Sequence, residues 1–177
     1  ISMKRDIKTL ENISDKFNKI GSKPKLKDVN LDLIINEVVS YYKSKLPKTN
    51  SITINYNQLE VSPLILKGDK ILLYWAFENI IKNSIDSIKN SKGIINIESQ
   101  IINERIKLVF IDNGVGISRK NRKKIFKPGF STKSKGWGIG LNLSKRIIEY
   151  IHKGSIKLIK STKNETIFEV ELNLSIS

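Results

Sequence analysis

Cysteine is absent from this sequence of 177 residues, and histidine occurs only once, at His152. Without cysteine the chain has no disulfide framework, no thiolate metal site and no cysteine nucleophile, which fits a reducing compartment. No apolar run approaches the roughly 18 residues of a membrane-spanning helix, and no signal-peptide pattern opens the chain. We therefore expect a soluble, cytoplasmic protein. Because the sequence starts at Ile1, we also expect a piece of a longer protein, and membrane anchoring of that parent is left open.

Aromatic and acidic residues are also scarce. Aromatic residues make up 7% of the chain, and 17 Asp and Glu stand against 32 Lys and Arg, which gives a formal net charge of +15. Such a charge suits nucleic-acid binding. The lysines, however, are spread along the whole chain, and the aromatic residues are not interleaved with basic clusters. We therefore expect no specific nucleic-acid partner, although a basic surface attracts polyanions, including nucleotides.

The first 20 residues form a pattern of their own. Their apolar side chains recur at steps of three and four, close to a heptad seam, and residues 21–24 (Gly-Ser-Lys-Pro) then break the helix. This favours one arm of a dimeric helical bundle over a helix packed on its own domain. We assign residues 1–24 to that arm and its linker, and residues 25–177 to a second domain.

The second domain combines helix and strand patterns. Asn30 can N-cap a helix over 31–45, Asp69 can cap a helix that contains residues 78–86, and a third helix is predicted over about 139–151. Apolar runs or alternating apolar positions predict strands at 52–56, 61–66, 95–101, 106–111, 156–159 and 167–174, with hairpin turns at 103–104 and 163–164. This order predicts an α/β (α+β) two-layer sandwich, with a mixed, mainly antiparallel sheet, helices on one face, and the amphipathic helix preceding it.

The helix that contains residues 78–86 has an unusual polar side. At about 100° per residue, one face carries Glu78, Asn79, Lys82, Asn83 and Asp86. The opposite face carries Phe77, Ile80, Ile81, Ser84, Ile85 and Ile88. Asparagine is unfavourable inside a helix because its side chain competes for backbone hydrogen bonds, so two of them suggest a function. Taken alone, however, this face is explained at least as well by a solvated helix surface.

Two glycine-rich segments and a loop follow. Residues 112–117 (Asp-Asn-Gly-Val-Gly-Ile) come directly after a buried strand, where a fixed carboxylate can accept a hydrogen bond from an exocyclic amine and glycines allow close approach to a flat ring. Residues 136–141 (Gly-Trp-Gly-Ile-Gly-Leu) open a helix, where exposed N–H groups favour phosphate. Between them, residues 126–133 contain Phe-Lys-Pro-Gly-Phe and then the phosphate-friendly Ser-Thr-Lys. Neither glycine segment is a Walker A loop or a dinucleotide fingerprint.

In this order, these segments resemble the N, G1, F and G2 boxes of the catalytic, ATP-binding domain of bacterial sensor histidine kinases. That domain belongs to the wider GHKL (Bergerat-fold) family, shared with gyrase and MutL-type ATPases. The resemblance covers residues from about 28 to the end. The helix over 1–20 resembles the second helix of the dimerisation and histidine-phosphotransfer domain. The short interval from 130 to 136 resembles the short-lid subclass.

The resemblance implies roles for individual residues. Asn83 would coordinate Mg²⁺ with Asn79 beside it, and Asp112 would bind the adenine amine. Lys82 would lie along the phosphates, and Glu78 would hold or activate the group at the γ-phosphate, so that Glu78, Asn79 and Lys82 form the catalytic set. The other implied ATP-binding positions are Asp86, Gly114, Gly116, Ile117, Phe130, Thr132, Lys133, Gly136, Trp137, Gly138, Ile139, Gly140 and Leu141. Of these, Lys133 and the backbone of 136–140 would close over the phosphates as a lid.

The implied activity is transfer of the ATP γ-phosphoryl group to a histidine on the upstream helical domain, and from there to a response regulator. A homodimer would form through the N-terminal helix. His152 matches a structural His-Gly-Gly-like turn, with Lys153 in place of the first glycine, so the acceptor would lie outside this chain. One alternative is another ATPase of this fold, gyrase-like, MutL-like or anti-sigma-type, against which the amphipathic segment argues. The other is a nucleotide-binding interaction module without kinase activity, against which the intact boxes argue.

Overall fold

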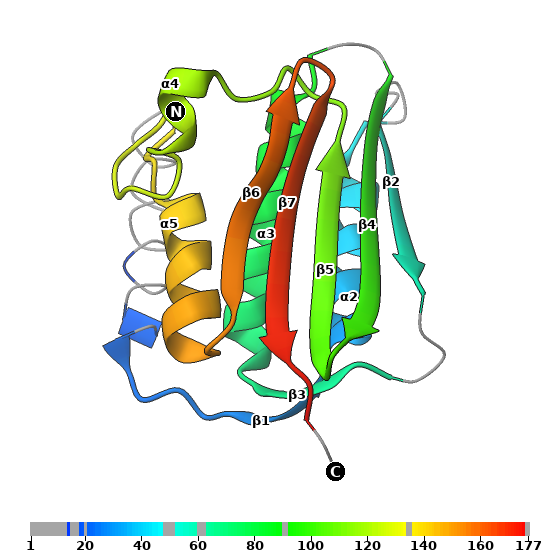
Figure 1. Cartoon of the computed structure of the whole chain (residues 1–177), viewed down its shortest axis with the longest axis vertical. Helices are drawn as coiled ribbons and strands as arrows, with labels where there is room; N and C mark the ends of the chain where they lie inside the picture. Colours follow the sequence, from blue (N-terminus) through cyan, green and yellow to red (C-terminus); the bar gives the residue numbers. More distant parts are fainter. Residues whose placement is uncertain are drawn as a thin grey trace.

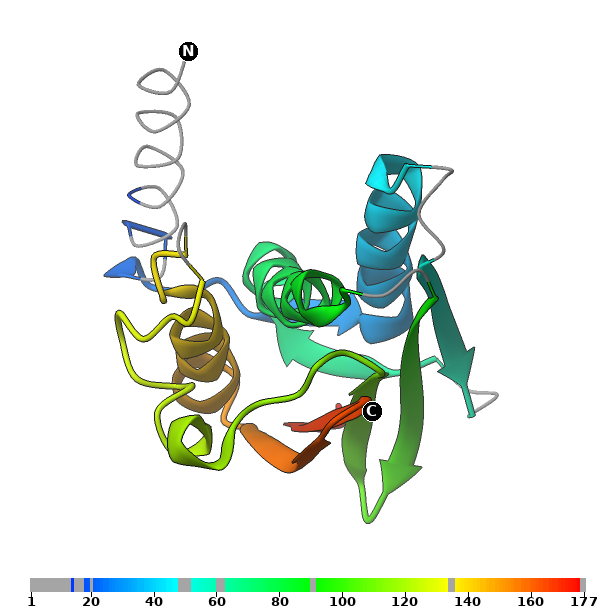
Figure 2. The same cartoon turned by 90° about the horizontal axis from the view of Figure 1, so that it is seen from above.

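The computed structural model describes residues 14, 18–19, 21–47, 52–59, 63–89, 92–133 and 136–175. These residues form two layers, a five-stranded sheet and a layer of helices that covers one of its faces (Figures 1 and 2). The elements are β1 (Lys27–Asn30), α2 (Leu31–Lys45), β2 (Ile52–Gln58), β3 (Ile65–Gly68), α3 (Lys70–Ser87), β4 (Gly93–Ile102), β5 (Arg105–Asp112), α4 (Arg119–Arg122), α5 (Gly140–Lys145), the π-helix η1 (Arg146–Ile151), β6 (Ser155–Thr162) and β7 (Glu165–Asn173).

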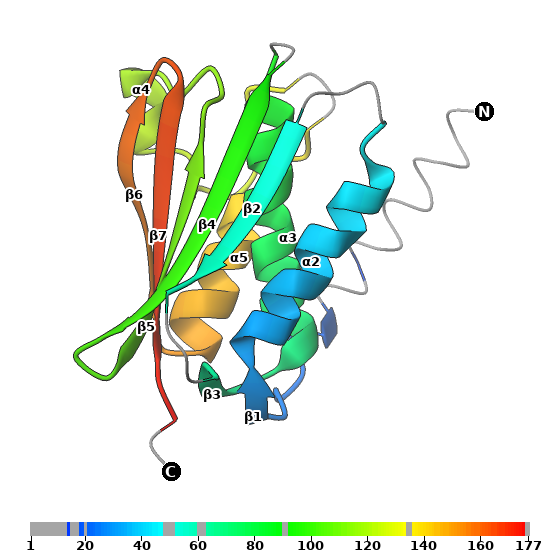
Figure 3. The ribbon, with the colours of Figure 1, turned by 90° about the vertical axis from the view of Figure 1, so that its right-hand side faces the viewer.

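The large sheet has the strand order β2-β4-β5-β7-β6. Only its first pair, β2 with β4, is parallel, and the other three pairs are antiparallel. Figure 3 looks onto the β2 edge of this sheet and shows α2 and α3 next to each other on the same side of the sheet. The predicted two-layer sandwich with a mixed, mainly antiparallel sheet is therefore confirmed.

The core lies between the sheet and the helices. Alternate residues of β4 and β5, such as Ile95, Ile97 and Leu108, point into it and are fully buried. From the helix side, Phe77 of α3 stacks on Phe110 of β5 with ring centroids 6.0 Å apart. Burying a side chain of this size stabilises the fold by about 1.5–3 kcal/mol. The core therefore holds one side of α3 against the sheet, and the opposite side of α3 faces away from the sheet.

The predicted helix caps and hairpin turns are present in the structure. The side chain of Asn30 accepts hydrogen bonds from the backbone at the start of α2, and Asp69 does the same for α3. The hairpin turn between β4 and β5 has positive φ at Asn103 and Glu104, and Asn164 has a φ of 70° between β6 and β7. Both predicted hairpins are thereby confirmed.

Two predictions about elements need correction. The helix predicted over about 139–151 begins as α5 and continues as the π-helix η1; Leu143 and Ile147 are buried, and Leu141 and Ile151 are half-buried. The short strand at 61–66 lies at 65–68 instead, paired with β1, which was not predicted. Of the helix predicted over 1–20, only residues 14, 18 and 19 are described, and they are helical. In the described part of the chain, no helix combines the length and the hydropathy needed to cross a membrane.

Candidate functional site

Helix α3 is the centre of the candidate site. Its core side, including Phe77, Ile80 and Ile81, is fully buried, as predicted. On the other side, Asn79 and Asn83 are half-buried, whereas Lys82 and Asp86 are exposed. The predicted polar face therefore exists, and part of it is screened from solvent by other segments.

The first of these segments is the turn after β5. Asp112 ends that strand and is only 3% exposed. Its Oδ1 accepts hydrogen bonds from the backbone N–H of Gly114 (2.9 Å) and the hydroxyl of Ser87 (3.1 Å), and its Oδ2 accepts one from Ser84 (2.9 Å). Burial raises the pKa of Asp112, while the donors at Gly114, Ser84 and Ser87 act in the opposite direction.

The glycines of this turn approach protein groups closely. A Cβ at Gly114 would lie 1.8 Å from the Ser87 hydroxyl oxygen. Gly116 has a φ of 77°, and a Cβ there would lie 2.2 Å from the carbonyl oxygen of Thr162. The neighbouring N–H of Ile117 donates to Ser161 at 2.7 Å. Packing against α3 and β6 already requires glycine at 114 and 116, and the expected approach of a flat ring to these glycines stays a prediction.

The second segment is the loop over residues 126–133. Phe126 packs edge-on against Phe168 of β7, and Phe130 also packs against the core. Gly129 donates its N–H to the carbonyl of Gly138 at 3.1 Å, which joins this loop to the glycine-rich segment. The two phenylalanines therefore anchor the loop, while Ser131 and Thr132 are exposed.

Lys133 reaches from this loop back to α3. Its ammonium lies 3.0 Å from the side-chain oxygen of Asn83 and 2.8 Å from a carboxylate oxygen of Asp86. Asp86 also pairs with Lys82 at 3.3 Å, one helical turn away. The sequence predicted that these four residues act in one site, and the structure brings them together.

The third segment is the start of α5. Gly140 lies against Asn79, so that a Cβ on Gly140 would be 3.1 Å from the Asn79 side-chain oxygen. The amide nitrogen of Asn79 is buried and has no hydrogen-bond partner among the residues that the structure describes. Ile139 and Leu141 are half-buried against the core, and Trp137 is 53% exposed. A buried donor next to a glycine-rich backbone suits an anionic oxygen.

Glu78 lies one turn before Lys82 along α3 and is half-buried. Burial, followed by the negative charge of Glu78, raises the pKa of Tyr42 on α2. By its position along the helix, Glu78 belongs to the predicted polar face.

His152 is buried and has partners on both ring nitrogens. Its Nε2 accepts the backbone N–H of Asp69 at 3.0 Å, so Nδ1 carries the proton and donates to the carbonyl of Ile147 at 2.9 Å. Burial lowers the pKa of His152, against smaller opposite effects of Ile147 and Asp69. This geometry agrees with a structural role for His152.

The side-chain oxygen of Asn83 could serve as a ligand for a divalent metal at this site. Within the described ranges, no three His, Cys, Asp or Glu side chains come together as a metal cluster. The side-chain oxygen of Asn83, however, already faces a cation, the ammonium of Lys133. Mg²⁺ commonly takes one or two protein oxygens and completes its shell with phosphate and water, so Asn83 fits this pattern.

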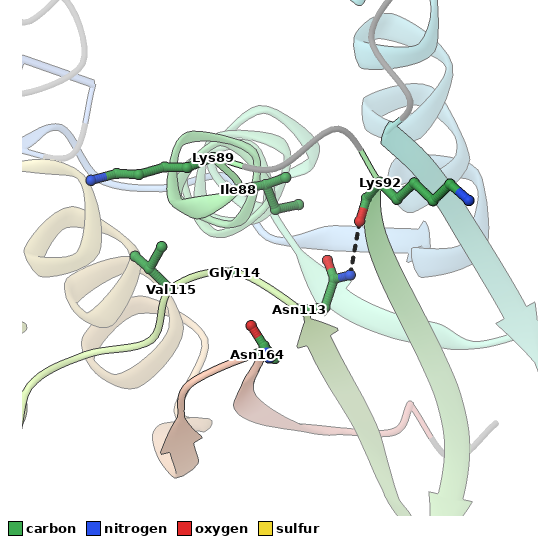
Figure 4. A pocket seen from close by; sticks show the side chains of 7 residues that line it. All are labelled: Ile88, Lys89, Lys92, Asn113, Gly114, Val115 and Asn164. Atoms are coloured by element: carbon green, nitrogen blue, oxygen red, sulfur yellow. Dashed lines mark hydrogen bonds between the residues drawn. The ribbon is translucent and has the colours of Figure 1, made fainter.

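A cavity of about 370 Å³ borders the turn after β5, next to the end of α3. Figure 4 shows Asn113, Gly114 and Val115 along one side of it, with the side chains of Lys89 and Lys92 pointing in different directions. Asn113 donates to the carbonyl of Lys92 at 3.0 Å. Since the two ammonium groups do not converge, this cavity does not form an anion site.

Sequence reasoning missed two polar residues of the site. Ser84 was placed on the core face of α3, and Ser87 was assigned no role, yet both contact Asp112. The available signal was Ser84 itself, a hydroxyl among isoleucines on a buried face. A buried hydroxyl requires a partner, and the sequence did not show which one.

Comparison with known proteins finds related sequences. A family model described as histidine kinase-, DNA gyrase B- and HSP90-like ATPase matches residues 68–176. Sporulation kinase B of Bacillus subtilis (strain 168) is 31% identical over 135 residues, which cover 72% of this chain and 31% of that protein. The signal transduction histidine-protein kinase AtoS of Escherichia coli (strain K12) is 33% identical over 131 residues, 73% of this chain and 21% of that protein. The chain thus spans less than a third of these relatives.

Solved structures share the fold. The catalytic domain of histidine kinase ThkA, in a nucleotide-free form, matches with a TM-score of 0.75 and 25% identity over 85% of this chain and 99% of that chain. A complex of ThkA with response regulator protein TrrA matches with a TM-score of 0.77 and 22% identity over 97% of this chain and 49% of that chain. The second likeness concerns the fold alone.

Proposed function

Because the chain belongs to the family of histidine kinase-, DNA gyrase B- and HSP90-like ATPases, we propose that it is the ATP-binding catalytic domain of a sensor histidine kinase. Its ATP γ-phosphoryl group goes to a histidine outside this chain and then to a response regulator. Residues 25–177 form the catalytic domain, and residues 1–24 end the helical domain that carries the acceptor and dimerises. The whole protein acts on the cytoplasmic side.

The observation that carries this proposal is the convergence of three segments on α3. The turn after β5 contacts it through Asp112, the loop over 126–133 through Lys133, and the start of α5 through Gly140. The Asp112 carboxylate, the Lys133 ammonium and the buried Asn79 amide therefore all lie next to α3. These are the groups that recognition of a purine and a triphosphate requires.

In this site each residue has a chemical task. Asp112 accepts the amine of adenine, and the Asn79 amide donates to a phosphate oxygen. Lys133 exchanges Asp86 and Asn83 for the phosphates, whose charge attracts the ammonium more strongly, and Lys82 lies along the same phosphates. Glu78 orients the acceptor at the γ-phosphate. Phosphoryl transfer depends mainly on such positioning and charge neutralisation.

Mg²⁺ would be held by Asn83 together with phosphate oxygens and water, and it would neutralise the charge of the phosphates. The Asn83 oxygen that would bind it is the one that now accepts a hydrogen bond from Lys133. Release of this lysine by the incoming nucleotide therefore exposes the ligand atom.

Calorimetry with ATP and with ADP, in the presence of Mg²⁺ or EDTA, tests nucleotide binding. We expect binding that depends on Mg²⁺, and Asn83→Ala should lose that dependence while keeping the fold. Absence of binding by the wild-type chain would reject the proposal. For the kinase step, γ-labelled ATP should place acid-labile label on an upstream histidine in a longer form of the protein and none on His152.

A further inference from the structure

The carboxylate of Asp112 is held by an unusually complete set of donors. It accepts three hydrogen bonds, from Gly114, Ser84 and Ser87, at 2.9–3.1 Å. Two of the three come from side chains of α3 rather than from the turn that carries Asp112. The orientation of this carboxylate is therefore determined by the helix.

The number of donors limits what else Asp112 can bind. An ionised carboxylate offers about four acceptor positions. Among the described residues, Oδ1 already has two donors, Gly114 and Ser87, whereas Oδ2 has one, Ser84. One acceptor position remains, on Oδ2, and it lies next to the hydroxyl of Ser84. A single further N–H donor fits this position, and a carbonyl oxygen is repelled there.

Ser84 and Ser87 do not contribute equally. Ser84 is 3% exposed, and within the described part of the chain its hydroxyl donates to Asp112 alone. The hydroxyl of Ser87 lies 2.8 Å from the carbonyl of Ser84 as well as 3.1 Å from Asp112, and its one proton is shared between them. Ser84 therefore fixes the carboxylate more strongly than Ser87 does.

We propose that Ser84 and Ser87 are positioning residues that set the preference of this site for a base with an exocyclic amine. They hold the Asp112 carboxylate so that the free position of Oδ2 points at that amine. The inference rests on the proposed function, because it requires that Asp112 contacts the base of a bound nucleotide. Neither serine needs to touch the nucleotide itself.

The test compares ATP with purine riboside triphosphate, which lacks only the 6-amino group. Calorimetry with Mg²⁺ gives the dissociation constants of both, and their ratio measures the contribution of the amine. For the wild-type chain we expect a preference for ATP of about tenfold, as for a hydrogen bond to a charged group. Ser84→Ala should lower this ratio about threefold or more, and Ser87→Ala should lower it by a smaller factor.

Ser99→Ala is the matched control, because Ser99 is also a fully buried serine but bonds to Tyr56 in another part of the sheet. It should leave the ratio unchanged. If Ser84→Ala weakens both ligands by the same factor, its role is structural and the inference is wrong. If the wild-type chain binds neither ligand, the proposed function fails and the inference fails with it. If the wild-type chain binds both equally, Asp112 does not read the amine, which also rejects the inference but leaves nucleotide binding standing.

Discussion

Asn79 shows how one residue can favour function over stability. Its amide nitrogen is buried beside the backbone of Gly140, without a hydrogen-bond partner in the described part of the chain. An unsatisfied buried donor costs about 1–3 kcal/mol. A bound phosphate oxygen would satisfy this donor, so the cost would fall only on the nucleotide-free protein.

Replacing Asn79 by leucine therefore should have opposite effects on stability and binding. Without nucleotide, Asn79→Leu should raise the free energy of unfolding by about 1 kcal/mol relative to Asn36→Leu. Asn36 is an exposed helical residue of α2, so this control carries the same change in helix propensity. With saturating Mg-ATP, the wild type and the control should gain about 2.7 kcal/mol at 100 times Kd, and Asn79→Leu should gain almost nothing. Urea denaturation with and without nucleotide measures both quantities; a destabilised variant that still responds to ATP would contradict the argument.

His152 makes the stability of the fold depend on pH. Because burial lowers its pKa in the folded state, the unfolded chain binds more protons than the folded chain below the ordinary histidine pKa of about 6.5. This contribution to stability is complete above that pH and is lost as the pH falls below it. A proton on Nε2 would also face the N–H of Asp69, which now donates to that atom.

His152→Gln should remove this pH dependence, since its side-chain carbonyl can still accept the Asp69 N–H and does not titrate. We expect the wild-type free energy of unfolding to fall by about 1 kcal/mol between pH 7 and pH 5.5, and the variant to show a smaller fall. Denaturant titrations at several pH values give the free energy of unfolding of both proteins. In the difference between the two proteins, the contributions of the carboxylates cancel. Parallel curves for the two proteins would show that His152 is not the titrating group.

At the scale of elements, the sequence predicted helix caps and hairpin turns but not the pairing of strands that are distant in the chain. The caps of α2 and α3 and the turns at 103–104 and 163–164 depend on neighbouring residues, and each was predicted. Strand β1 forms because it pairs with β3. In this pair Asn30 lies opposite Ile65 and Lys27 lies opposite Gly68, so the partners are far apart in the sequence. At the end of the π-helix η1, the carbonyl of Ile147 accepts hydrogen bonds from the backbone and the side chain of His152, five residues further along. These partners are not visible in a local pattern.

The candidate site divides in the same way. The residue types and spacing indicated α3, Asp112 and the glycine-rich segments as parts of one site. The contacts of Lys133 with Asn83 and of Ser84 with Asp112 depend on how the elements pack, and they were not predicted. The unpartnered amide of Asn79 is likewise a property of the folded chain.

The glycine-rich segment 136–140 passes close to the backbone of residues 129–130, and this contact gives a prediction for nucleotide binding. Gly138 has a φ of 66°, and a Cβ there would lie 2.4 Å from the carbonyl carbon of Gly129. Gly138→Ala should displace the two segments and lower ATP affinity on the order of tenfold to a hundredfold. Gly129→Ala is the control, because its φ of 74° brings the same backbone strain but its Cβ would meet no atom within 4 Å. Calorimetry compares the two; equal losses would show that strain and not the contact matters.

At the scale of the whole molecule, the layers separate the core from the site. The core face of α3 packs on the sheet and, through Ser84, on Asp112 of the turn after β5, whereas its polar face meets Lys133 of the loop over 126–133 and Gly140 of α5. A change on the polar face therefore leaves the packing of the core largely intact. This separation is what allows the binding variants above to be tested in folded protein.

The net charge of +15 belongs to the molecule as a whole and predicts how binding depends on salt. Charges farther apart than the Debye length, about 10 Å at 0.1 M salt, are screened, so the general attraction for anions should weaken as salt rises. Between about 0.05 and 0.3 M NaCl, ATP and purine riboside triphosphate should therefore lose affinity by the same few-fold factor, which leaves the preference for ATP unchanged.

A labelled DNA oligonucleotide should bind only at the low-salt end and without sequence preference, because phosphate contacts alone are lost steeply with salt. Fluorescence anisotropy measures the DNA and calorimetry the nucleotides, and sequence-dependent DNA binding at 0.3 M would contradict our expectation that the basic surface has no specific nucleic-acid partner.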